Sequence, residues 1–133
     1  MKKNDLVSIP QINDTLIYVG VVTNDTHFGE VTVLIGDRRE MFSINTLEKL
    51  GTMKIKKDSE CVAPATMALF EHGGVTMSGI IIQSRVEEDS SELMYEIMTN
   101  DASLFISGHQ IIKCCQICDP IELGHMYDTD AII

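Results

Sequence analysis

The sequence predicts an all-β protein with two small antiparallel barrels in tandem and a C-terminal extension. Three observations predict this fold class. Segments of about five residues, rich in valine, isoleucine and threonine, alternate with tight turns, as short antiparallel strands do. The stretch from Gly36 to Leu50 returns 64 positions later, from Asn100 to Cys114. Hydrophobic residues make up 44% of the 133 residues, enough for a packed interior.

The first barrel is expected in residues 1–52. Its main strands are predicted at residues 5–10, 15–24, 30–36 and 40–44. Gly20 is expected to bend the second strand, because a glycine inside a strand commonly marks a bulge. Tight turns fall at residues 25–29 and 37–39, and a short helical turn is expected to begin with Asn45 as its N-cap.

The second barrel, expected in residues 53–117, repeats that order. Its strands are predicted at residues 60–64, 78–86, 93–99 and 103–107. An acidic hairpin at residues 87–92 joins the second strand to the third, and residues 108–113 form a closing turn. The offset between matching segments grows from 55 to 59 to 64, so the two copies differ in their loops, where insertions are tolerated. Such a pattern is typical of a tandem duplication.

The C-terminal extension covers residues 118–133, outside both repeats. It ends in Ala-Ile-Ile, an apolar sequence that is poorly placed in solvent. We therefore expect the extension to dock on a barrel or on a neighbouring chain, with Tyr127, Ile132 and Ile133 making protein contacts. The lysine-rich stretch at residues 51–59 is the expected linker between the barrels.

Charge is unevenly distributed along the chain. Residues 1–56 carry seven basic and seven acidic side chains, whereas residues 57–133 carry three basic and thirteen acidic ones, and so the whole net charge of −10. This field disfavours nucleic acid as a partner, because binding to phosphates depends on cationic side chains. No apolar run is long enough to cross a bilayer or to serve as a signal peptide, so we expect a protein made in a cytoplasm, without disulfides.

Cysteines are the strongest candidates for chemistry. Cys115 and Cys118 have the C-x-x-C spacing of a zinc knuckle, and Cys61, His109 or His125 would have to complete a tetrahedral site. The alternative is that these cysteines are small apolar core residues. Because no second C-x-x-C pair exists, we favour this alternative and expect no metal and no cofactor. Cys61, Cys115 and Cys118 are the residues that a zinc ion would use.

No catalytic pattern is present in the sequence. The chain lacks the G-x-S-x-G and H-E-x-x-H motifs, and its glycine-containing stretch at residues 70–79 lacks the lysine of a phosphate-binding loop. The four histidines are far apart in the sequence. The sequence therefore predicts a protein that is not an enzyme.

Two charged hairpins are the candidate binding surfaces. Arg38 and Arg39 form an adjacent arginine pair at the expected tip of a hairpin in the first barrel, and arginine is enriched in interface hot spots. Glu87, Glu88 and Asp89 form an acidic tip in the second barrel. Either the two tips join neighbouring copies head to tail, or both are ordinary solvated hairpins. Self-association therefore stays open.

The strand order and its marker residues resemble the SH3-like small barrels found in many bacteriophage proteins. Such barrels carry a glycine-marked strand, a V-x-V strand ending in a glycine–aspartate turn, an aromatic residue and a closing leucine. In the first copy these places are taken by Gly20, Val31, Val33, Ile35, Gly36, Asp37, Phe42 and Leu47. In the second copy they are taken by Gly79, Tyr95, Ile97, Thr99, Asn100, Asp101, Phe105 and Ile111. The tryptophan common in the third strand is absent from both copies, as are the basic face of nucleic-acid-binding relatives and an aromatic cage.

The resemblance implies a scaffold that mediates contacts. We expect a structural or accessory part of a phage virion, capsid or tail, that is made in the host cytoplasm. It would bind other virion proteins through its barrels and its C-terminal extension. An alternative is an acidic inhibitor or regulator that occupies the basic groove of a nucleic-acid enzyme. A third interpretation is a barrel that contacts nucleic acid through Lys2, Lys3, Arg38 and Arg39.

Overall fold

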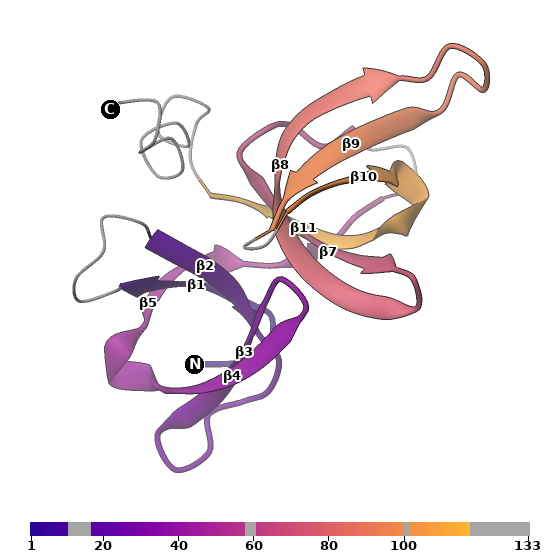
Figure 1. Cartoon of the computed structure of the whole chain (residues 1–133). Coiled ribbons are helices and arrows are strands. Elements are labelled where there is room, and N and C mark those ends of the chain that lie inside the picture. The colour runs from indigo at the N-terminus through magenta and orange to yellow at the C-terminus, as the bar shows by residue number, and fades with distance from the viewer. Residues whose placement is uncertain (11–16, 58–60, 100–101, 118–133) are drawn as a thin grey trace, which may run out of the picture.

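The computed structural model describes residues 1–10, 17–57, 61–99 and 102–117. In this part of the chain, eleven strands form two antiparallel sheets, and two three-residue 3₁₀ helices connect strands (Figure 1). The predicted all-β fold class is confirmed. The C-terminal extension lies outside the described residues, and with it the predicted contact and zinc residues Cys118, Tyr127, Ile132 and Ile133.

The first sheet has five strands in the order β4-β3-β2-β1-β5. They are β1 Asp5–Pro10, β2 Ile17–Val22, β3 Glu30–Ile35, β4 Arg38–Ser43 and β5 Glu48–Thr52. A 3₁₀ helix, η1 Ile44–Thr46, carries the chain from β4 at one edge to β5 at the other. The N-cap of η1 is Ser43 and not Asn45 as predicted, because the Ser43 side chain accepts a hydrogen bond from the Asn45 backbone N–H.

The second sheet has six strands in the order β10-β9-β8-β7-β11-β6. They are β6 Lys54–Ile55, β7 Thr66–His72, β8 Val75–Val86, β9 Leu93–Met98, β10 Ser103–Ser107 and β11 Ile111–Gln116. A second 3₁₀ helix, η2 Gly108–Gln110, precedes β11 and is capped by Ser107, 64 positions after Ser43. Apart from β6, the order matches that of the first sheet, so the predicted return of one strand order is found in the structure.

Neither sheet closes into a barrel, which corrects the prediction. Among the described residues, β4 does not pair with β5, and β10 does not pair with β6. In the first sheet, β4 and β5 pair inward with β3 and β1 and are separated by η1. Closure of the second sheet would need β10 to pair with the outer side of β11, and β6 already occupies that side. Each sheet is curled but open at its edge strands (Figure 1).

The first strand of the second copy lies at residues 66–72, not at residues 60–64 as predicted. Pro64 lacks the backbone N–H that a ladder needs, and Ala65 has a left-handed backbone, with φ of 65°. The ladder therefore begins only at Thr66. Matching the glycine pairings of the two hairpins gives an offset of 61 at this strand, instead of 55.

Buried apolar side chains form three clusters. The first sheet encloses Val7, Ile9, Val22, Val31, Val33 and Ile35. The second sheet encloses Val62, Ala68, Phe70, Ile81, Tyr95, Ile97, Ile106 and Ile111. The third cluster, here called the shared core, draws on both sheets and contains Leu6, Val19, Val21, Met53, Ala65, Met67 and Ile80.

The stretch predicted as a linker, residues 51–59, is built into the fold where it is described. Its first two residues belong to β5, Met53 is buried in the shared core, and the next two residues form β6. An apolar side chain at the centre of a lysine-rich segment is what joins this segment to the core. The two copies are therefore packed against each other instead of being tethered by a loose connection.

Ser78 ties the two sheets together through hydrogen bonds. It is only 1% exposed, and its hydroxyl donates to the Leu34 carbonyl at 2.9 Å and accepts from the Gly36 N–H at 3.1 Å. Its own backbone N–H donates to the Gly36 carbonyl at 2.9 Å. β8 of the second sheet is thereby fixed to the end of β3 of the first.

Candidate functional site

A cationic groove lies between the two sheets. Its volume is about 310 Å³, and its charged side chains are Lys3, Arg39 and Lys113. No acidic side chain of the described residues lines it, and apolar side chains from β2, β3, β7 and β11 complete its walls. Because both sheets contribute to the lining, the groove exists only where the two copies are joined. It is called the cationic groove below.

Each cation of the groove is held by a different element. Arg39 is the second residue of β4 and pairs with β3. Lys113 follows a register shift in β11, and its Nζ donates to the Asn4 Oδ1 at 3.0 Å. Lys3 precedes β1, and its backbone N–H donates to the Asp25 Oδ1 at 2.9 Å. Within the described part of the chain, none of the three cations forms an ion pair.

The arginine pair lies at the start of β4 and not at a hairpin tip, which corrects the prediction. The β3–β4 turn consists of Gly36 and Asp37 alone, so Arg38 and Arg39 already pair with β3. Successive strand residues point to opposite faces, and only Arg39 lines the groove. Sequence reasoning missed Lys113, because no local pattern links it to residues so far away in the chain.

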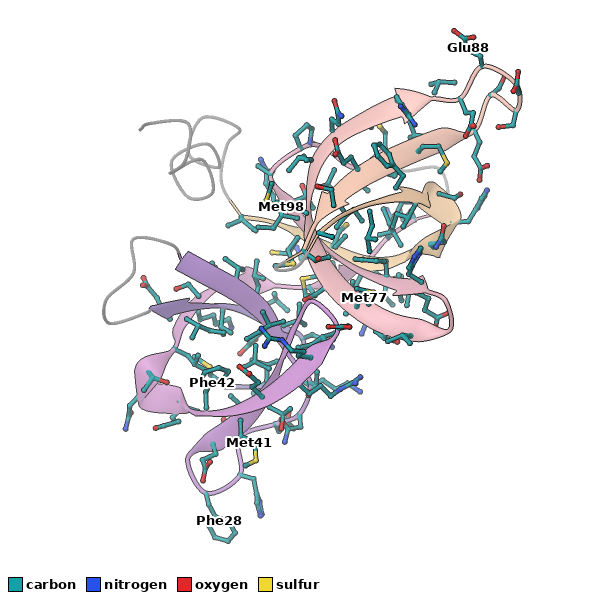
Figure 2. All side chains as sticks on the ribbon, viewed as in Figure 1. Phe28, Met41, Phe42, Met77, Glu88 and Met98 are labelled. Carbon is teal, nitrogen blue, oxygen red and sulfur yellow. The ribbon has the colours of Figure 1, made fainter. Side chains whose placement is uncertain are left out.

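The predicted acidic hairpin is an ordered projection of the second sheet. It joins β8 to β9, and Figure 2 shows Glu88 at its end, pointing away from the first sheet. The Glu87 N–H donates to the Glu92 carbonyl, and the Ser91 N–H donates to the Glu87 carbonyl, both at 2.8 Å. Glu87, Glu88 and Asp89 are exposed. Residues 87–92 are called the acidic tip below.

An exposed phenylalanine occupies the turn between β2 and β3. His27 and Glu30 exchange two backbone hydrogen bonds, of 2.9 and 3.1 Å, which leaves Phe28 and Gly29 as the two turn residues. Both have positive φ, 51° and 75°. This is the pattern of a type I′ turn, in which asparagine, aspartate and glycine are favoured. Phe28 is nevertheless 90% exposed, at the end of its hairpin (Figure 2).

Met41 is a second exposed apolar side chain of the first sheet. Met41 on β4 is 66% exposed, and Figure 2 shows it with Phe28 at the end of the first sheet that faces away from the second sheet. The His27 ring meets the Phe28 ring edge-on, with centroids 4.3 Å apart. Phe28, Met41 and the free edge of β4 are called the Phe28 surface below. Sequence reasoning missed it, because residues 25–29 have only the pattern of an ordinary turn.

Three cysteines line a second pocket, of about 430 Å³. Cys61, Cys114 and Cys115 lie there together with Lys54 and Lys57, and this pocket is called the thiol pocket below. Burial raises the pKa of the Cys115 thiol, although a backbone hydrogen bond and the charge of Lys54 act in the opposite direction. A raised pKa keeps this thiol protonated at neutral pH, which disfavours it as a nucleophile.

The zinc candidates are only partly brought together. Cys61 and Cys115 share the thiol pocket, whereas Cys118 lies outside the described residues. His109 is exposed on η2. Across the ranges that the structure describes, no group of three or more His, Cys, Asp or Glu side chains is arranged to hold a metal ion.

Tyr95 links the thiol pocket to the core of the second sheet. Its buried hydroxyl accepts a hydrogen bond from the Val62 N–H at 3.0 Å and lies 3.9 Å from the Cys61 Sγ. Burial raises the pKa of Tyr95 above its ordinary value of 10.0. The Val62 hydrogen bond lowers that pKa, whereas the Cys61 and Cys114 thiols raise it further.

The raised pKa of Tyr95 predicts a loss of stability in alkali. Above about pH 10 the unfolded chain releases the tyrosine proton while the folded chain keeps it, so the free energy of unfolding falls as pH rises. Tyr95→Phe should flatten this fall between about pH 9 and 11, measured by thermal unfolding. At neutral pH it should destabilise the fold by about 1–3 kcal/mol, because the Val62 N–H loses its acceptor. Cys115→Ala, the control, should retain the Tyr95 part of the fall, and equal slopes in wild type and Tyr95→Phe would contradict the prediction.

Comparison with protein-family models and with curated proteins gives no match to this chain. Within the described residues, no helix is long and apolar enough to cross a membrane. Four features of the described residues are candidate binding sites: the cationic groove, the acidic tip, the Phe28 surface and the thiol pocket.

Proposed function

We propose that this protein is a non-catalytic binding component of a larger protein assembly, a structural or accessory part of a phage virion. The observation that carries the proposal is the exposed Phe28 in a left-handed turn. The strand order and marker residues that resemble SH3-like phage barrels support the phage part of the proposal. The partner is a protein with an apolar pocket that receives the phenyl ring.

Phe28 has a left-handed backbone conformation, which is unfavourable for phenylalanine. A left-handed backbone destabilises a residue with a Cβ atom by about 1–2 kcal/mol, a penalty that asparagine and glycine largely escape. Burial of a phenylalanine side chain in a partner gains about 2–3 kcal/mol. Because the side chain is 90% exposed, no part of the chain that the structure describes provides that burial, and a partner would. A bulky anchor on a strained turn is typical of an interface hot spot.

The neighbouring edge strand gives this anchor a second means of attachment. β4 pairs with β3 on one side only, and its other edge is free among the described residues. The unpaired backbone groups of an edge strand accept a strand from another protein. An apolar anchor beside a free edge therefore suits a partner that offers a pocket and a strand together.

Replacing the anchor separates stability from binding. Phe28→Asn is expected to raise the free energy of unfolding by about 1 kcal/mol, or the melting temperature by about 4 °C, because asparagine suits the turn. Incorporation into particles should fall at least about tenfold, because the ring no longer fills its pocket. The control is Phe105→Asn, which removes an exposed ring from β10, where it lies 4.6 Å from the Arg85 guanidinium, and should not raise the melting temperature.

The proposed role is tested by particle composition. Particles purified from the native source should contain the wild-type chain at a fixed copy number, measured by quantitative mass spectrometry, and should lack the folded Phe28→Asn variant. Wild-type protein found only in the soluble fraction, or equal incorporation of the variant, would overturn the proposal.

A further inference from the structure

We propose that copies of this protein associate head to tail, with the acidic tip of one copy seated in the cationic groove of the next. The tip offers Glu87, Glu88 and Asp89, all exposed. The groove offers Lys3, Arg39 and Lys113. This inference goes beyond the proposed function, because it concerns self-association through the acidic tip and the cationic groove, neither of which includes Phe28.

Charge complementarity identifies the occupant. The groove gathers three cations in a chain whose net charge is −10, and the described residues put no carboxylate in its lining. The largest exposed run of carboxylates described in the structure is the acidic tip itself. Apolar contacts match as well, since Val86 beside the tip is 63% exposed and Ile112 in the groove is 38% exposed.

Both surfaces are organised before they meet. Two backbone hydrogen bonds, each of 2.8 Å, close the tip. In the groove, Lys113 is held by Asn4 at 3.0 Å, and the β3 end is fixed to β8 through Ser78. Preformed partners lose little conformational entropy on binding, which favours association.

The positions of the acidic tip and the cationic groove on one chain mean that they can meet only between different copies. The tip projects from the second sheet and points away from the first (Figure 2), whereas the groove lies at the junction of the sheets. Tip and groove are therefore different patches, and their contact is heterologous. Such contacts build a ring if the rotation closes and a filament if it does not.

Salt should act on this association in two opposite ways. At about 0.01 M salt the Debye length is about 30 Å, so whole copies of net charge −10 repel each other. At about 0.1 M the Debye length is about 10 Å, and contact pairs outweigh the screened repulsion. At about 1 M even contact pairs are weakened. Association should therefore be strongest near about 0.1 M and at least about tenfold weaker at about 1 M.

Charge-reversed variants test the geometry directly. Sedimentation of the purified full chain, at concentrations of about 10 to 1000 μM, should show wild-type oligomers. Arg39→Glu, which disables the groove, and Glu88→Lys, which disables the tip, should each associate at least about tenfold more weakly. The matched controls are Arg38→Glu, beside the groove, and Asp37→Lys, an exposed carboxylate of another hairpin, and both should associate like wild type.

Mixing the two disabled variants distinguishes head-to-tail contact from any other mode. An equimolar mixture retains one intact tip on Arg39→Glu and one intact groove on Glu88→Lys, so it should form dimers that cannot grow further. A mixture that stays monomeric would overturn the proposal, as would an Arg38→Glu variant that is as defective as Arg39→Glu. A wild-type chain that stays monomeric would also overturn it. Particle incorporation that depends on Phe28 is independent of all these outcomes.

Discussion

Replacing Ser78 with alanine is expected to lower the free energy of unfolding by about 2–4 kcal/mol, which corresponds to roughly 10 °C in melting temperature. The hydroxyl bonds the Leu34 carbonyl and the Gly36 N–H, groups of the other sheet. Alanine leaves both without this partner, and each buried unsatisfied group costs about 1–3 kcal/mol. Water cannot easily replace the hydroxyl, because Ser78 is 1% exposed and Leu34 is fully buried.

Denaturant unfolding measures this loss against a serine of the same strand. Ser84 lies on β8 and is exposed, so Ser84→Ala should change stability by less than about 0.5 kcal/mol. The contrast isolates the bridge between the sheets from the effect of alanine on strand propensity. Equal stability of the two variants would mean that the hydroxyl of Ser78 does not hold the sheets together.

The strand order could be predicted from the sequence because local patterns determine it. β-branched segments separated by short turns mark the strands, and Gly20 and Gly79 mark the same strand in each copy. Ser43 and Ser107 cap equivalent 3₁₀ helices at an offset of 64, although the predicted cap of the first helix, Asn45, was wrong. Each of these features depends on residues close together in the chain, where propensity and turn chemistry act directly.

The junction of the two copies could not be predicted in the same way. β7 is buried on both faces, with Met67 in the shared core and Ala68 in the core of the second sheet. A strand with two apolar faces loses the alternation that identifies a half-exposed strand. The preceding residues, which end in Pro64, were therefore predicted to be the strand instead. Packing between distant segments, and not local propensity, determines this part of the fold.

Among the candidate sites, too, those formed by neighbouring residues could be predicted and those formed by distant residues could not. The acidic tip is a continuous run in the sequence and was predicted with its residues. The cationic groove combines Lys3, Arg39 and Lys113, which meet only after both sheets fold and pack. Phe28 could not be predicted as a binding residue for another reason. Its residue type is ordinary, and only the left-handed φ together with its exposure distinguishes it.

Gly20→Ala and Gly79→Ala are each expected to destabilise the protein by about 2–3 kcal/mol, or roughly 7–11 °C in melting temperature. A Cβ at Gly79 would overlap the Ile97 Cγ2 and lie 2.9 Å from the Met98 carbonyl oxygen. A Cβ at Gly20 would meet β3 in the same way, 2.8 Å from a carbonyl oxygen. A backbone oxygen held in a ladder cannot swing aside as a side chain can, so the strands must separate.

A third glycine supplies the control for these two variants. Gly74 has φ of 80°, but a Cβ there would have no atom within 4 Å. Gly74→Ala should therefore lose only about 1 kcal/mol, from backbone strain. If Gly74→Ala were as damaging as Gly79→Ala, the close approach of neighbouring strands would not be the reason for glycine at positions 20 and 79.

The two glycine variants also decide whether the copies fold together. Gly20 lies in the first sheet and Gly79 in the second, but the shared core takes side chains from both. Unfolding of either sheet exposes that core, so each substitution should shift one common transition in calorimetry, with calorimetric and van't Hoff enthalpies equal. Two transitions, of which each variant moves only one, would contradict this coupling. A single transition would mean that the cationic groove forms only when both copies are folded, because its lining belongs to both sheets.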